Sequence, residues 1–201
     1  MSHSVNTGVS MGRWEPDAVG RLRAAALDLF VERGYEGTTV ADIAERAGLT
    51  ARTFFRHFAD KREVLFQGSD RLQQAMVDAV REVPAQASVR DAVAAALRAA
   101  AGFFGDIRAF ARRRRDVIAA SAELRERELI KLASLSAALA DALAARGVAA
   151  LDARLAAESA TLVFRVAFER WLEPDETRGF GAIADELLQR LGALHRASRA
   201  A

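Results

Sequence analysis

The apolar and polar positions of the chain follow the 3.6-residue period of an α-helix nearly throughout. Apolar residues recur every three or four positions, and the stretches between them are rich in Ala, Leu, Arg and Glu, which favour helices. The three prolines, Pro16, Pro84 and Pro174, fall where a helical pattern begins or ends. No stretch shows the two-residue period of a strand. The pattern therefore predicts an all-α protein.

Capping residues, glycines and prolines divide this pattern into about nine predicted helices. Thr39 with Asp42, and Ser88 with Asp91, have the spacing of capping boxes, and Thr50 is placed to cap the helix that follows it. The predicted ranges are 16–33, 39–48, 50–58, 61–83, 88–103, 108–120, 124–146, 151–172 and 178–197.

Composition restricts the class of protein. The chain has 201 residues and no cysteine, which excludes disulfides, thiolate zinc sites and a cysteine nucleophile, and which fits a reducing cytoplasm. Its apolar fraction of 51% is interrupted by charges every few residues, so no segment is predicted to span a membrane. The histidines, His3, His57 and His195, are scattered and there is no Gly-rich phosphate loop, so we expect neither an enzyme nor a bound cofactor or metal.

Charge is concentrated in one short segment. The formal net charge of the whole chain is only +2. Residues 46–62, in contrast, hold five cations against the single acid Asp60, a local net charge of +4. Two short helices joined at Gly48 can place the second helix in a DNA major groove while the first crosses the backbone. The five cations are Arg46, Arg52, Arg56, Lys61 and Arg62.

The same segment resembles the TetR family of bacterial repressors. The resemblance extends over residues 16–76, whereas the rest of the chain is similar to the family only in the number and length of its helices. It implies a DNA-binding domain at 16–76 with its helix-turn-helix at 39–58, and an effector-binding and dimerisation domain at 77–201. The polar, Ser/Gly-rich composition of the N-terminus separately predicts a disordered arm at 1–15. The motif residues are Gly34, Tyr35, Thr38-Thr39-Val40, Ala41-Asp42-Ile43-Ala44, Ala47-Gly48-Leu49-Thr50, Thr53-Phe54-Phe55, His57-Phe58 and Lys61.

The resemblance implies two kinds of DNA contact. Thr39 and Thr50 would meet phosphates through their hydroxyls and helix-start amides, Lys61 would hold the backbone, and His57 matches a family histidine near it. The remaining predicted contacts are with bases, by Ala51, Arg52, Thr53 and Arg56.

Phe55 departs from the family pattern. The family usually has tyrosine there, and phenylalanine lacks the hydroxyl that would donate to a phosphate. We expect Phe55 to pack against a sugar or a thymine methyl group instead.

A set of aromatic residues suggests an effector pocket in the C-terminal region, since the family encloses a small hydrophobic effector there. The alternative is that these residues are core. The run Arg112–Arg115 is spread around its helix, so most of its members should be solvated and one or two could attract an anionic head group. An anionic acyl or a planar aromatic effector both remain open. The predicted pocket residues are Phe103, Phe104, Phe110, Phe164, Phe168 and Trp171.

The last two helices carry apolar stripes that a dimer would bury. In the family two such helices from each subunit form a two-fold interface, which sets two helix-turn-helix motifs on a palindromic operator. The sequence therefore predicts a homodimeric regulator, a repressor by resemblance, and the alternative is a helical protein-interaction module without sequence-specific DNA binding. The predicted interface residues are Leu155, Leu162, Val163, Val166, Ile183, Leu187, Leu188, Leu191 and Leu194.

Overall fold

The computed structural model describes residues 17–105 and 107–197, with side chains described as far as Leu194. Over these residues the chain is all-helical, which confirms the predicted fold class; the arm expected at 1–15 and the helix start at Pro16 lie outside them. No helix of the described part is long and apolar enough to cross a bilayer. The helices are α1 (Ala18–Arg33), α2 (Val40–Arg46), α3 (Ala51–His57), α4 (Glu63–Phe66), α5 (Ser69–Glu82), α6 (Val89–Ala101), α7 (Arg108–Ala120), α8 (Ala122–Ala145), α9 (Ala150–Trp171) and α10 (Phe180–Ala197).

Helix starts agree with the capping residues in the sequence. Thr39 and Asp42 form a reciprocal capping box at α2, and Ser88 and Asp91 form another at α6. The Thr50 hydroxyl accepts from the Thr53 amide at 3.2 Å and so caps α3. Each cap satisfies backbone amides that the first turn of a helix leaves unpaired.

The single helix predicted at 61–83 is wrong, because the structure has two helices there. Gly68 has φ 93°, in the left-handed region that interrupts an α-helix, and the Ser69 hydroxyl donates to the Phe66 carbonyl at the break. The four-residue α4 thus becomes a short link between α3 and α5. This break raises the number of helices in the described residues to ten.

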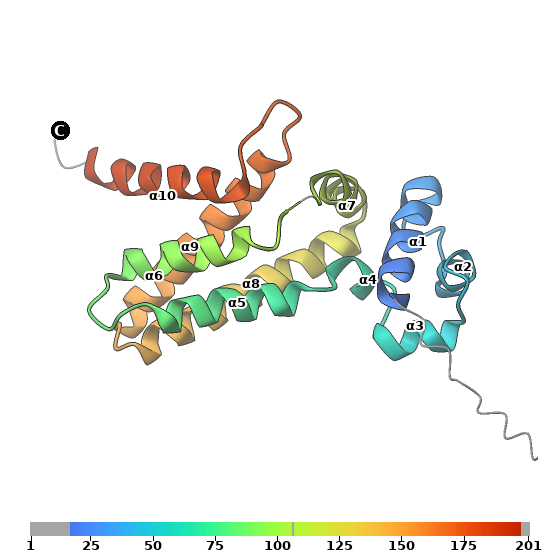
Figure 1. Cartoon of the computed structure of the whole chain (residues 1–201), viewed down its shortest axis with the longest axis horizontal. Helices are drawn as coiled ribbons and strands as arrows, with labels where there is room; N and C mark the ends of the chain where they lie inside the picture. Colours follow the sequence, from blue (N-terminus) through green and yellow to red (C-terminus); the bar gives the residue numbers. More distant parts are fainter. Residues whose placement is uncertain (1–16, 106, 198–201) are drawn as a thin grey trace, which may run out of the picture.

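Two apolar cores divide the molecule, as Figure 1 shows by the separation of α1–α3 from the bundle of α5, α6, α8, α9 and α10. The first core joins α1–α4 and includes Val117 and Ile118 of α7 and Leu124 of α8. The second core begins in α5, with Met76 and Val80 fully buried. α4 and α7 therefore lie at the junction of the two parts, and the domain boundary at 76–77 stays a prediction.

The four arginines of Arg112–Arg115 are not simply solvated as expected. Arg112 donates to carbonyls at the end of α9, and Arg113 pairs with Asp28 of α1 at 2.6 Å. Arg114 donates to the Leu65 carbonyl of α4. Because consecutive residues of a helix point about 100° apart, the run reaches three different neighbours of α7.

Candidate nucleic-acid interface and cavity

The short turn between α2 and α3 fixes the two helices against each other. Gly48 has φ 66°, and the Leu49 amide donates back to the Ala44 carbonyl at 2.8 Å. On α3, Phe54 is fully buried and its ring centroid lies 5.1 Å from that of Phe58, so one face of the helix is anchored in the first core. The opposite face is held rigidly at the surface.

That outer face of α3 presents three of the four predicted base-contacting residues, Ala51, Arg52 and Arg56, whereas Thr53 is half-buried beside Thr50. Arg52, Arg56 and His57 are exposed, as is Ala51, and the Phe55 ring is 57% exposed. The exposed ring of Phe55 lies on the same helix face as Arg52 and Arg56, so this face combines apolar surface with two cations.

The two predicted phosphate-contacting threonines already act as helix caps. The Thr39 hydroxyl donates to an Asp42 carboxylate oxygen at 2.6 Å, and the Thr50 hydroxyl lies 3.0 Å from the hydroxyl of Thr53. Both threonines are exposed at the starts of α2 and α3. DNA contact by these residues stays a prediction.

Intramolecular partners reduce the free positive charge that the sequence suggested. Arg46 pairs with Glu32 through two hydrogen bonds of 2.9 and 3.0 Å, which lower the pKa of Glu32. Arg62 pairs with Asp60 at 2.7 Å and with Glu123 at 3.3 Å. Among the described residues of this segment, Arg52 and Arg56 are the cations that lie on an exposed helix face and have no acidic partner. Both belong to α3.

Lys61 is partly buried, and its ammonium is bonded within the protein. Its Nζ donates to the Tyr35 carbonyl at 2.7 Å and to the Thr38 carbonyl at 2.9 Å, and it lies 3.9 Å from the centroid of the Tyr35 ring. The ammonium therefore ties the segment after α3 to the α1–α2 loop. An ammonium has three donors, so one remains after these two bonds; a DNA contact by Lys61 stays a prediction.

Tyr35 belongs to the junction between the two parts, a contact that sequence analysis missed. Its hydroxyl donates to Glu123 of α8 at 2.9 Å, and burial with this bond raises the pKa of Tyr35. The partners are 88 residues apart, so no local pattern could have paired them.

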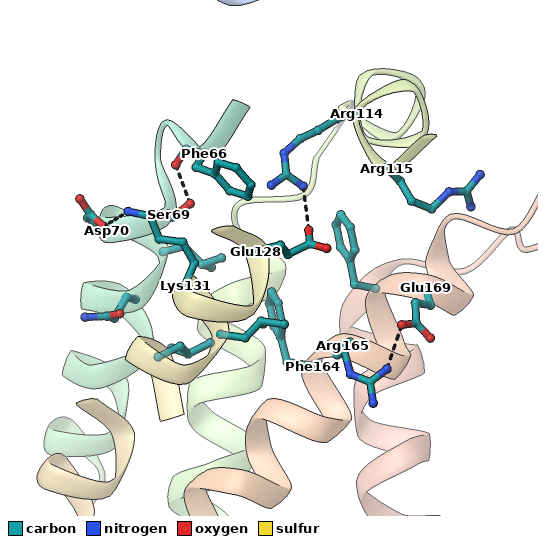
Figure 2. Close-up of a pocket in the computed structure, with 15 residues that line it drawn as sticks. Phe66, Ser69, Asp70, Arg114, Arg115, Glu128, Lys131, Phe164, Arg165 and Glu169 are labelled. Atoms are coloured by element: carbon teal, nitrogen blue, oxygen red, sulfur yellow. Dashed lines mark hydrogen bonds and ion pairs between the residues drawn. The ribbon is translucent and has the colours of Figure 1, made fainter. Parts of the chain in front are cut away.

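A cavity of about 210 Å³ lies between α4–α5, α7, α8 and α9 (Figure 2). Of the six aromatic residues predicted for a pocket, only Phe164 and Phe168 line it. The other lining residues are Phe66, Ser69, Asp70, Leu72, Gln73, Arg114, Arg115, Glu128, Lys131, Leu132, Leu135, Arg165 and Glu169.

The other predicted pocket aromatics are corrected by the structure. Phe104 lies at the centre of an aromatic cluster, 4.7–6.0 Å from the rings of four neighbours, and Trp171 is buried within it. Phe110 packs on the first core, where Arg23 covers its ring at 5.0 Å. Phe103 is half-buried and does not line the cavity. Aromatic–aromatic packing of this kind is the alternative that the sequence left open.

The predicted dimer face divides into exposed and buried residues. Leu155 is 58% exposed, Leu162 43% and Leu194 69%, whereas Val163 and Ile183 lie inside the second core and cannot form an interface. The other predicted interface residues have intermediate exposure: Val166, Leu187, Leu188 and Leu191.

Leu151, which the sequence analysis did not select, is 69% exposed. With Leu155 and Leu162 it occupies positions i, i+4 and i+11 of α9, which share one helix face. These three residues form an apolar stripe on the surface, here called the α9 stripe.

Comparison with known proteins agrees with this architecture. The model of the family "Bacterial regulatory proteins, tetR family" matches residues 22–67, which include α2 and α3. The transcriptional regulator TcmR of Streptomyces glaucescens is 42% identical over 82 residues, 41% of this chain and 36% of TcmR. The transcriptional repressor KstR2 of Mycobacterium tuberculosis is 44% identical over 46 residues, 23% of each chain. The matched segment is thus well under half the length of either relative.

A solved structure extends the likeness of fold to nearly the whole chain. The transcriptional regulator FadR of Bacillus subtilis, solved in complex with stearoyl-CoA, has a TM-score of 0.57 at 18% identity, covering 85% of this chain and 95% of FadR. The matched family is one of regulatory proteins, not of enzymes, as we expected. Residues 22–67, which include the helix-turn-helix, are similar to the tetR family of bacterial regulatory proteins.

Proposed function

We propose that this protein is a cytoplasmic transcriptional repressor that binds a palindromic operator as a homodimer and leaves it when a small hydrophobic effector binds. The observation that carries the proposal is the outer face of α3. It combines Arg52, Arg56 and the exposed ring of Phe55 on a helix whose other face is fixed by Phe54 and Phe58.

These side chains suit a DNA major groove. An arginine fork donates to guanine O6 and N7, and an apolar ring contacts a thymine methyl group. The exposed caps Thr39 and Thr50 place the starts of α2 and α3 at the surface, where free amides and hydroxyls favour phosphate oxygens. α3 would therefore enter the groove while α2 lies along the backbone.

A dimer is supported by the α9 stripe. Three leucines more than 40% exposed on one face of a helix cost free energy in water, and a second copy of the same face would bury them. Two copies of α3 would then lie about one helical turn of DNA apart, roughly 34 Å, on a two-fold symmetric site.

An effector site is supported by the cavity beside α4. Its walls come from four parts of the chain, including α7, which also contacts the first core. A ligand there would contact the same helices that position α1–α3. A pocket with apolar walls and a few polar groups is the usual form of a small-molecule site.

The test is a selection of bound fragments from the source genome, followed by gel retardation. The account predicts that the recovered fragments share an inverted repeat, and that the protein retards this DNA at a salt concentration where a shuffled sequence stays free. A promoter fused to the repeat should then be less active when the protein is present; greater activity would mean an activator. Binding without sequence preference would favour the interaction-module alternative.

A further inference from the structure

The cavity beside α4 has an apolar floor and a charged rim. Figure 2 shows Arg114 reaching from α7 toward Glu128 of α8, while Arg115 points away. The Arg114 side chain is only 17% exposed, the least of the four cations that line the cavity. The floor consists of Leu72, Leu132, Leu135, Phe164 and Phe168.

Arg114 also has the longest ion pair of these four cations. A guanidinium stays charged even when it is buried, so a long pairing distance leaves part of its desolvation cost without compensation. The closest N–O distances are 2.8 Å for Arg115–Asp116, 3.1 Å for Lys131–Asp70, 3.1 Å for Arg165–Glu169 and 3.5 Å for Arg114–Glu128.

The remaining surroundings of Arg114 supply no further negative charge. Its Nε donates to the Leu65 carbonyl at 2.7 Å and its guanidinium lies 4.9 Å from the centroid of the Phe66 ring. Within the described part of the chain, its Nη2 donates no hydrogen bond. Burial lowers the pKa of Arg114, and the nearby charge of Arg23 acts in the same direction.

Arg23 on α1 adds to the local excess of positive charge. It is partly buried, and its buried Nε has no hydrogen-bond partner among the described residues. Arg23 does not line the cavity, but its charge acts on Arg114, whose contacting carboxylate is that of Glu128. This arrangement favours the entry of an anion over that of a cation.

We propose that the cavity binds a small amphipathic carboxylate, with the carboxylate on Arg114 and the hydrocarbon chain on the apolar floor. The proposal rests on the proposed function, in which this cavity is the effector site. A guanidinium fork matches a carboxylate through two parallel hydrogen bonds. The volume of about 210 Å³ is below the roughly 300–1,000 Å³ of pockets for drug-sized ligands, so the chain that fits is short.

The position of Arg114 also connects the carboxylate to α4. The Nε that holds the Leu65 carbonyl belongs to the same rigid guanidinium that would rotate to meet a ligand. Binding of the carboxylate and retention of the α4 contact therefore compete for one group. Ligand binding would therefore weaken a contact of α4, the helix that joins the two cores.

The test compares three eight-carbon probes that differ only in their head groups: octanoate, octanol and octylamine. Isothermal titration of the full chain at fixed salt should show that octanoate binds about tenfold tighter than either of the others, since a charge-assisted pair contributes at least about 1.5 kcal/mol. In Arg114→Gln, octanoate should lose about tenfold in affinity while octanol stays within about twofold of the wild type. Unchanged octanol binding would show that the cavity is still folded.

Two further variants separate charge from structure. Arg114→Lys keeps the cation and should retain part of the preference for octanoate. Arg115→Gln removes a cation of the same cavity that is already paired with Asp116 at 2.8 Å, and its octanoate affinity should match that of the wild type.

Four results would each overturn the proposal. In the wild type these are equal binding of octanoate and octanol, a preference for octylamine, and no binding of any probe. The fourth is full octanoate affinity in Arg114→Gln. The proposed function is tested separately, by measuring whether the ligand-free protein binds DNA. A chain that binds octanoate through Arg114 but retards no operator would refute the regulator and leave this ligand site in place.

Discussion

Replacement of Lys61 by methionine tests whether this residue holds the DNA-binding part together. Methionine keeps an apolar side chain of similar length and removes the ammonium, which has two hydrogen bonds to the Tyr35 and Thr38 carbonyls and a contact with the Tyr35 ring. Hydrogen bonds of a charged group contribute about 1.5–3 kcal/mol each, and an exposed cation–π contact about 0.5–1 kcal/mol. Lys61 is only partly buried, so water can replace some of these contacts.

We therefore expect Lys61→Met to lower the free energy of unfolding by about 2 kcal/mol, or the Tm by about 4–8 °C for a chain of this size. The assay is urea unfolding followed by circular dichroism at one protein concentration, with the slope of the transition checked for constancy. Arg52→Met, which removes an exposed cation of α3, is the control and should change the stability by less than about 0.5 kcal/mol. A Lys61→Met variant as stable as the control would refute the reasoning.

The remaining predictions concern three other parts of the molecule. Phe104→Ala should cost about 2–3 kcal/mol in thermal unfolding, because the partly buried ring fills the centre of the aromatic cluster; a loss below about 1 kcal/mol would place the ring outside the core. Leu155→Glu with Leu162→Glu should yield monomers in sedimentation velocity, since two carboxylates would have to be buried in the α9 interface, and persistent dimers would exclude that interface. Hydrogen bonds from Arg178 lower the pKa of Glu176 to about 2, so its stabilisation is present above the unfolded value near 4.3 and is lost as the pH falls toward 2; Glu176→Gln should lower the Tm at pH 7 and match the wild type near pH 2, and a constant difference would contradict this assignment.

Local signals in the sequence were sufficient for most helix boundaries. The capping boxes of α2 and α6 depend on residues three positions apart, and both formed as expected. The break at Gly68 was missed because the helical spacing of apolar residues continues on both sides of it. A glycine within a periodic pattern allows a break but does not require one, since the choice depends on how the flanking helices pack.

Features set by distant residues could not be read from the sequence. Arg114 and Lys61 look like ordinary surface cations, but their acceptors are backbone carbonyls 49 and 23–26 residues away, and carbonyls have no sequence signature. Phe104 and Phe164 are the same residue type, yet Phe164 of α9 lines the cavity whereas Phe104, in the loop between α6 and α7, packs in the aromatic cluster. Periodicity identifies the apolar face of a helix, whereas core, cavity and interface are distinguished only by what that face meets.

The central claim, that α3 reads DNA, is tested most directly by the operator affinity of Arg52→Ala combined with Arg56→Ala. Two arginine–guanine contacts at about 1–3 kcal/mol each predict a loss of at least about thirtyfold on the selected inverted repeat, with less effect on shuffled DNA. Arg90→Ala, an exposed arginine at the start of α6 in the second part, should bind like the wild type. A double variant that binds the repeat as tightly as the wild type, at the same salt concentration, would contradict the account.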